Sequence, residues 1–147
     1  MIRNTTQTYG SVAKFFHWAI FLLLAVMIPV GFIMGDIENQ AWQALAYSLH
    51  KQMGLIILGL MVLRVAWTCT NVKPALPFMT PAWQRLSERV VHFGLYLSLF
   101  ALPISGWVGS VAAGYTPILA GYSFSLPINK SENLAETAFD YVHIPFV

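Results

Sequence analysis

Four histidines are the residues whose type and placement in this sequence best suit chemistry: His17, His50, His92 and His143. Each lies within or at the edge of a long apolar segment. A single histidine near a helix end is often only an interfacial residue. Ionisable side chains are expensive at membrane depth, however, and those that occur there usually face the interior of a helix bundle. Because neutral imidazole binds metals well, we interpret the four histidines as candidate ligands.

Three histidines are followed, fourteen residues later, by a glycine or an arginine: His17 by Gly31, His92 by Gly106 and His50 by Arg64. Fourteen residues are almost four turns of an α-helix, so the two members of each pair share a face about 21 Å apart along the axis. If successive helices run in opposite directions, the histidines form two tiers. His17 and His92 lie in an inner tier, and His50 and His143 lie in an outer tier.

Two tiers of imidazole favour two haem groups held inside a helix bundle. Gly31 and Gly106 would lie in the outer tier, and Gly54 lies one turn after His50. At all three positions the missing side chain would leave room for a flat macrocycle. Close helix packing is the plainer explanation for such glycines.

Arg64 would lie in the inner tier, where its planar guanidinium could pair with a haem propionate. Alternatively, it is an interfacial residue that extends to the membrane surface. Zinc is the competing metal, but a catalytic zinc usually has three clustered protein ligands. Cys69 is the only cysteine, which excludes a C-x-x-C-H haem attachment and a cysteine-rich metal site.

The elements that position these residues follow from composition. The chain has 147 residues, of which 57% are hydrophobic and 10% charged, whereas a soluble domain is about 45–50% apolar and about 25% charged. Apolar runs predict membrane helices near residues 13–35, 42–68 and 86–112. A fourth helix begins near residue 133 and is truncated in this chain. We therefore expect a single all-α domain over residues 1–147, an up-and-down transmembrane four-helix bundle.

Basic residues are unevenly divided between the two ends of this bundle. Six of them fall on the side of the N-terminus: Arg3, Lys14, Arg64, Lys73, Arg85 and Arg89. Lys51, Lys130 and most acidic residues fall on the other side. The excess of positive charge on cytoplasmic segments then predicts a cytoplasmic N-terminus.

Four stretches carry a family resemblance: "KFFHWAIFLLL", "LHKQMGLIILGLMVLRVAW", "VVHFGLYLSLFALPISGW" and "LAGYSFSLP". Together they resemble the bacterial cytochrome b561 family over nearly the whole chain. This family comprises small inner-membrane dihaem proteins related to the cytochrome b subunits of hydrogenases and formate dehydrogenases. The order of the H-K-x-x-G-x(9)-R and H-x-x-x-Y-x(6)-P-x-x-G patterns makes the match specific.

The resemblance implies two b-type haems, each with two axial histidines. His17 would bind the inner haem, and His50 would bind the outer haem together with His143. The inner partner of His17 would fall ten residues beyond Val147, so the inner site is incomplete in this chain. Depth alone would pair His17 with His92. The third-helix histidine is not a usual ligand in the family, and His92 is instead expected to contact a propionate or a quinone.

Haem iron with two axial histidines has no open position, which indicates electron transfer. The resemblance implies ubiquinone as the acceptor and superoxide, or another outer-face donor, as the source of electrons. Lys51, beside His50, would attract the anion and is the candidate catalytic residue. Two alternatives stay open: a cytochrome b subunit that links a partner dehydrogenase to quinone, and a haem-free membrane anchor or transporter with a histidine proton path. Membrane lipid is an expected partner and nucleic acid is not.

Overall fold

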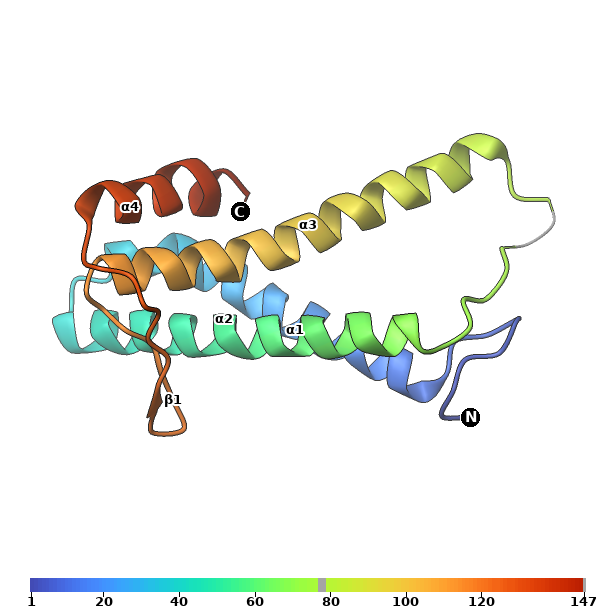
Figure 1. Ribbon diagram of the computed structural model, residues 1–147, viewed down its shortest axis with the longest axis horizontal. Coiled ribbons are helices and arrows are strands. Elements are labelled where there is room, and N and C mark those ends of the chain that lie inside the picture. Colours follow the sequence, from blue (N-terminus) through green and yellow to red (C-terminus); the bar gives the residue numbers. More distant parts are fainter. Residues whose placement is uncertain (77–78, 147) are drawn as a thin grey trace.

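The computed structural model describes residues 1–76 and 79–146, and it is mainly helical (Figure 1). In chain order its elements are α1 (Ser11–Ile33), η1 (Met34–Asp36), α2 (Gln40–Cys69), α3 (Ala82–Ala112), β1 (Ile118–Leu119), β2 (Tyr122–Ser123), α4 (Glu132–Glu136), η2 (Thr137–His143) and η3 (Ile144–Phe146). The predicted all-α membrane bundle is confirmed. Its helices begin up to four residues earlier than the apolar runs suggest, because polar residues join the first turns.

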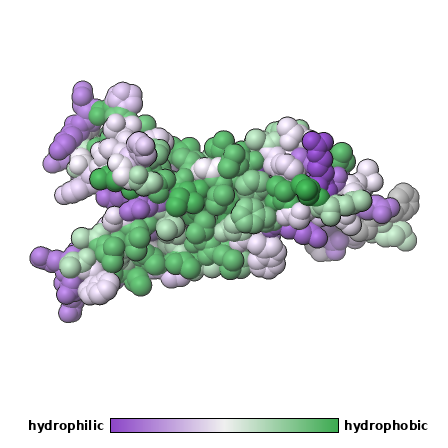
Figure 2. Space-filling model, turned by 90° about the horizontal axis from the view of Figure 1, so that it is seen from below, coloured by the Kyte–Doolittle hydropathy of each residue, from purple (hydrophilic) through white to green (hydrophobic). Residues whose placement is uncertain are grey.

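Within the part of the chain that the structure describes, three segments are long and apolar enough to cross a membrane: Ser11–Asp36, Gln40–Cys69 and Ala82–Ala112. Large apolar side chains cover their outer surfaces. Phe15 is 63% exposed and Phe93 is 72% exposed, and Figure 2 shows a broad apolar band between hydrophilic ends. Such a band matches the hydrocarbon core of a bilayer, so these side chains face lipid.

α2 lies at the centre of the packing, with α1 against one side and α3 against another. The shared core is formed by Ile20 and Met27 of α1 and by Ile57 and Met61 of α2. Met61 is fully buried, and side chains of α3, including Tyr96, pack against this cluster. The core therefore fixes the three long helices relative to one another near their middle.

Side-chain caps mark where two of the helices begin. The Asn39 Oδ1 accepts hydrogen bonds from the backbone N–H groups of Ala41 (3.0 Å) and Trp42 (3.2 Å) at the start of α2. At the start of α4, the Ser131 Oγ accepts from the Leu134 N–H at 3.3 Å. These bonds satisfy N–H groups that the first helical turn leaves without partners. The sequence thereby sets the helix starts at the end of the bundle that holds His50.

The connections gather at two opposite ends (Figure 1). The α1–α2 and α3–α4 connections share one end, and the N-terminal segment and the α2–α3 connection share the other. At the second end the Ala75 N–H donates to the Thr6 carbonyl at 2.9 Å, and the Asn4 Nδ2 donates to the Val72 carbonyl at 3.0 Å. The up-and-down topology places His17 towards this second end and His50 towards the first.

The α3–α4 connection contains a small antiparallel hairpin that the sequence did not predict. Leu119 pairs with Tyr122 in register, and Ala120 and Gly121 form the turn with φ values of 51° and 83°. Two successive positive φ values are typical of a tight hairpin turn, for which Asn-Gly is the usual sequence signal. Ala-Gly lacks that signal. The Trp107 Nε1 donates to the Phe124 carbonyl at 2.8 Å and ties this connection to α3.

The fourth helical element, α4 continued by the π-helical η2, packs along the final turns of α3 (Figure 1). Glycine makes this close approach possible. A Cβ atom added at Gly109 would lie 2.8 Å from two ring carbons of Phe139. Real Cβ atoms are essentially never so close to a neighbour. The Phe139 ring can therefore pack against α3 in this way because residue 109 is a glycine. This contact positions the next turn of η2, which ends at His143.

Candidate functional site

Two of the four histidines face each other across the bundle. The rings of His50 on α2 and His143 on η2 have centroids 6.2 Å apart and planes inclined by 76°. Both side chains are partly buried. Metal–imidazole bonds are about 2.0–2.1 Å long, so two imidazoles on opposite sides of one metal ion have centroids about 6 Å apart. The separation therefore suits a shared metal ion.

His143 is held by the backbone of α3. Its Nδ1 lies 2.8 Å from the Leu102 carbonyl oxygen and 3.3 Å from the Ser105 Oγ. A carbonyl can only accept a hydrogen bond, so the Nδ1 carries the proton. The Nε2 lone pair is then available for a metal, and the second nitrogen is anchored as in most metal-binding histidines.

His50 differs from His143 in this respect. Its Nδ1 is buried and has no hydrogen-bond partner among the residues that the structure describes. An unpartnered buried polar atom is costly in a folded protein. At His50 this cost is consistent with a ligand site, in which the imidazole ring interacts with a bound group and not with another part of the polypeptide.

A glycine lies directly against each of the two imidazole rings. A Cβ atom at Gly31 would lie 3.2 Å from the His50 Cε1, and one at Gly106 would lie 2.9 Å from the His143 Cε1. Both glycines therefore lie in the outer tier, beside the rings of these two histidines. The structure gives them a role in seating the imidazoles, in addition to the clearance for a macrocycle that the sequence suggests. Gly54 has nothing within 4 Å of such a Cβ atom among the described residues.

An apolar cavity of about 510 Å³ adjoins His50 between α1 and α2. Leu23, Met27 and Val30 line it from α1, and Leu49 and Met53 line it from α2, with Trp42 near one end. Small-molecule and cofactor sites are typically cavities of this size and character. A cavity of this kind beside His50 suits a large, flat, apolar cofactor bound through nitrogen.

The donor set also bears on the choice of metal. In the described ranges, no three His, Cys, Asp or Glu side chains gather in one group. Zinc sites usually have three or four protein ligands, whereas haem iron takes four nitrogens from the macrocycle and two axial ligands from the protein. The residues around His50 and His143 fit haem. When bound, haem supplies one-electron chemistry.

Lys51 and Arg64 each lie over an aromatic ring. The Lys51 Nζ is 5.1 Å from the centroid of the Tyr115 ring in the α3–α4 connection, and the Arg64 Cζ is 5.7 Å from that of Tyr96 on α3. Both side chains are partly buried. Cations over aromatic faces are stabilised by the ring quadrupole. These contacts hold two positive charges inside the ends of the bundle, one on each side of its core.

The two remaining histidines have other neighbours. His17 is exposed on α1, with its ring 5.9 Å from that of Trp18. The His92 Nδ1 lies 3.5 Å from the Glu88 Oε1, which also lies 3.4 Å from the Lys73 Nζ. The structure thus brings His50 and His143 together with Gly31 and Gly106. It places His92 beside the Lys73–Glu88 ion pair near the second end of the bundle.

Sequence reasoning missed the groups that support His143. The Leu102 carbonyl and the Ser105 hydroxyl contact its ring nitrogen, and Phe139 packs edge-on against its ring with centroids 6.1 Å apart. A backbone carbonyl leaves no trace in the sequence. Ser105 is next to Gly106 in the sequence, but consecutive helical residues lie about 100° apart around the axis, so this position gave no signal of its contact with His143.

Comparison with known proteins gives two findings. A family model described as prokaryotic cytochrome b561 matches residues 8–144. A curated protein of Escherichia coli (strain K12), cytochrome b561 homolog 2, is 33% identical over 138 residues. The match covers 92% of this chain and 72% of that protein. The family match extends over all the elements that build the site.

Proposed function

The chain belongs to the prokaryotic cytochrome b561 family of membrane b-type electron-transfer cytochromes, and from this premise we propose that His50 and His143 would hold a b-type haem between them. The observation that carries the proposal is the opposed pair of imidazole rings, 6.2 Å apart. Gly31 and Gly106 seat the two rings, and the Leu102 carbonyl orients one of them. The cavity that adjoins His50 between α1 and α2 is apolar, which suits a macrocycle.

This arrangement supports electron transfer over binding of a gas or substrate at the iron. If His50 and His143 both hold the haem iron, they would leave no position open for dioxygen. The protein's own residues then have three tasks. They would orient the imidazoles, line the cavity beside His50 with apolar side chains such as Met27 and Met53, and hold the two ligands in place.

We extend the proposal to a second haem at the opposite end of the bundle, with His17 as a ligand and Arg64 as the partner of a propionate. Support comes from the fourteen-residue spacing and from the position of Arg64, which is partly buried over Tyr96. An arginine held in this way could offer a planar pair of donors to a carboxylate. Electrons would then pass between the two ends of the bundle.

The proposed acceptor is ubiquinone, and the proposed donor is superoxide at the end that holds His50. Lys51 supports the donor assignment because it places a positive charge one residue from His50, at the end that we assign to the outer face. Replacing Lys51 by Gln should slow haem reduction by superoxide several-fold, and more at low ionic strength than at high. Stopped-flow absorbance would measure the rate, with dithionite reduction as a reference.

Lys73→Gln is the matched control, since this lysine belongs to the α2–α3 connection, which lies at the opposite end of the bundle. An equal slowing in both variants would contradict steering by Lys51. A rate in Lys51→Gln that equals the wild-type rate at every ionic strength would do the same.

The ligand assignment is tested by counting haem. Wild-type protein and the His50→Ala, His143→Ala and His92→Ala variants would be purified, and the haem content per chain measured as the pyridine haemochrome. We expect His50→Ala and His143→Ala each to lose one haem per chain, because one remaining imidazole holds the iron poorly. His92→Ala should keep the wild-type content. Unchanged haem content in His50→Ala would refute the assignment.

A further inference from the structure

The nitrogen that anchors His143 shares its acceptor with a hydroxyl group. The His143 Nδ1 donates to the Leu102 carbonyl oxygen at 2.8 Å, and the Ser105 Oγ donates to the same oxygen at 3.0 Å. The Oγ also lies 3.3 Å from the Nδ1. Ser105 is 7% exposed, so water does not compete freely for these contacts. One carbonyl therefore receives two donors in a buried cluster.

The opposed histidine has no such anchor. The His50 Nδ1 is buried without a hydrogen-bond partner in the described part of the chain. The two imidazoles are therefore inequivalent, although their rings face each other. A change in the hydrogen bond of His143 would alter only one of the two ligands. Its effect can therefore be measured separately from any effect of His50.

We propose that Ser105 is a positioning residue that raises the reduction potential of the haem held by His143. The inference rests on the proposed ligation by that histidine. A strong hydrogen bond from the Nδ1 makes the imidazole more anionic and a better donor to iron, which stabilises the oxidised state. Ser105 donates to the same Leu102 carbonyl oxygen, so that oxygen accepts the hydrogen bond from the His143 Nδ1 less strongly. The ligand is then less anionic, and the reduced state is favoured.

Neither proton moves in this scheme. One electron enters on reduction and leaves on oxidation, while His143 keeps its Nδ1 proton and Ser105 keeps its hydroxyl proton. The hydroxyl alters the strength of a neighbouring bond and does not touch the reacting atom. Serine in a helix often donates to the carbonyl three residues earlier, so the Ser105–Leu102 bond alone would be unremarkable. Its significance comes from the His143 nitrogen on the same carbonyl.

Ser105→Ala is the direct test. Removing the hydroxyl leaves the Leu102 carbonyl to His143 alone, so the midpoint potential of the haem transition should fall. Redox titration followed by visible spectroscopy measures the midpoint. The relevant transition is identified as the one that His143→Ala loses. Ser110→Ala is the matched control, because Ser110 is equally buried on α3, at 5% exposure, and should leave the midpoint at the wild-type value.

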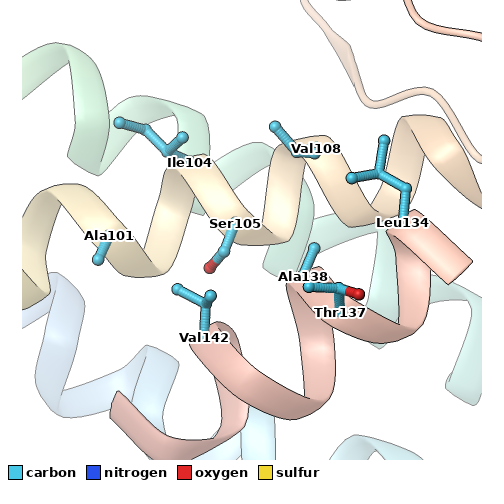
Figure 3. Close-up of a pocket in the computed structure, with 8 residues that line it drawn as sticks. All are labelled: Ala101, Ile104, Ser105, Val108, Leu134, Thr137, Ala138 and Val142. Atoms are coloured by element: carbon cyan, nitrogen blue, oxygen red, sulfur yellow. The ribbon is translucent and has the colours of Figure 1, made fainter.

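Ser105→Thr supplies a rescue, since it keeps the hydroxyl. Figure 3 shows the Ser105 side chain directed from α3 towards η2, beside a cavity of about 330 Å³ that Ala138 and Val142 also line. This cavity has room for the added methyl group. We expect the threonine variant to keep a midpoint close to the wild-type value.

Should Ser105→Ala fail to retain haem, Ser105→Cys gives the same test, because a thiol donates more weakly than a hydroxyl. A lower midpoint in the alanine or cysteine variant, with no change in Ser110→Ala, supports the inference. A midpoint that is unchanged or higher in a haem-loaded variant overturns it. Full haem content in His143→Ala would instead refute the proposed ligation, so the two failures are distinguishable.

Discussion

At Gly106, the addition of a single methyl group should strongly reduce haem binding. A Cβ atom there would lie 2.9 Å from the His143 Cε1 and 3.2 Å from its Nδ1. Alanine in place of glycine usually favours a helix by about 1 kcal/mol. Here it would push the imidazole away from His50, and overpacking of this kind typically costs about 1–3 kcal/mol.

Gly106→Ala should therefore lower the content of the haem bound by His143 by more than half, without preventing membrane insertion. Gly94→Ala on the same helix is the control, because a Cβ atom there meets nothing within 4 Å among the described residues. Haem content per chain is the measurement. Gly31→Ala should be milder, since its contact with the His50 Cε1 is 3.2 Å. Equal haem content in Gly106→Ala and Gly94→Ala would contradict this reading.

At the residue scale, the fourteen-residue spacing was sufficient to select Gly31 and Gly106 as candidates from the sequence. It could not show which atoms they approach. Side-chain orientation depends on the relative rotation of α1, α2 and α3, and this rotation follows from core residues such as Ile57 and Met61, whose partners lie on other helices.

η2 is the element on which the site depends most, because it supplies His143. Its attachment to α3 rests on Phe139, whose ring occupies the space that a side chain at Gly109 would need. Phe139 and His143 are four residues apart and their rings touch edge-on. A shift of Phe139 would consequently move His143, although the three atoms nearest to a Cβ at Gly109 all belong to Phe139.

Gly109→Ala should thus reduce haem content and lower the melting temperature by several degrees. The double variant Gly109→Ala with Phe139→Leu should recover part of the haem, since the smaller side chain relieves the overlap at 2.8 Å. Haem content and thermal unfolding followed at the Soret band are the measurements. If the double variant binds no more haem than Gly109→Ala alone, the effect does not pass through the Phe139 contact.

Element boundaries were predicted well where polarity changes sharply and poorly where it does not. The apolar runs placed three long helices correctly. The β1–β2 hairpin was missed because its turn, Ala120–Gly121, lacks the usual Asn or Asp. The fourth helix was expected from about residue 133, and α4 begins at Glu132.

For the whole molecule, the distribution of basic residues predicts a direction in the membrane. The start of α3, which carries Arg85 and Arg89, and the α2–α3 connection, which carries Lys73, lie at the end that also holds the N-terminal segment (Figure 1). We propose that this end is cytoplasmic in a bacterial inner membrane. The hairpin and the α1–α2 connection then face outwards, together with the end of α2 that carries His50.

Cys69 provides a direct test of this orientation. It is the only cysteine, it is exposed, and it ends α2 at the proposed cytoplasmic end. A membrane-impermeant maleimide should label it in inverted vesicles and not in intact spheroplasts. A Cys69→Ser, Tyr122→Cys variant should show the reverse pattern, because Tyr122 lies in the hairpin and is 76% exposed. Labelling of Cys69 in intact spheroplasts would contradict the proposed topology and support the opposite orientation.

The sequence by itself determined the class of the protein, its three long helices and the histidines that merit attention. Each of these properties depends on local composition, or on a helical period that converts spacing into position along one axis. Family membership likewise follows from the linear order of motifs.

Helical spacing and the family resemblance already pair His50 with His143, and only the tertiary structure decided how the two rings lie and what holds them. The pairing of His50 with His143 requires α2 and η2 to face each other across the bundle. The close packing of η2 on α3 in turn depends on Gly109 and Gly106 receiving Phe139 and His143. The Leu102 carbonyl has no sequence signature at all, since every residue carries one. Its contact with His143 exists because two segments some forty residues apart meet at one turn of α3.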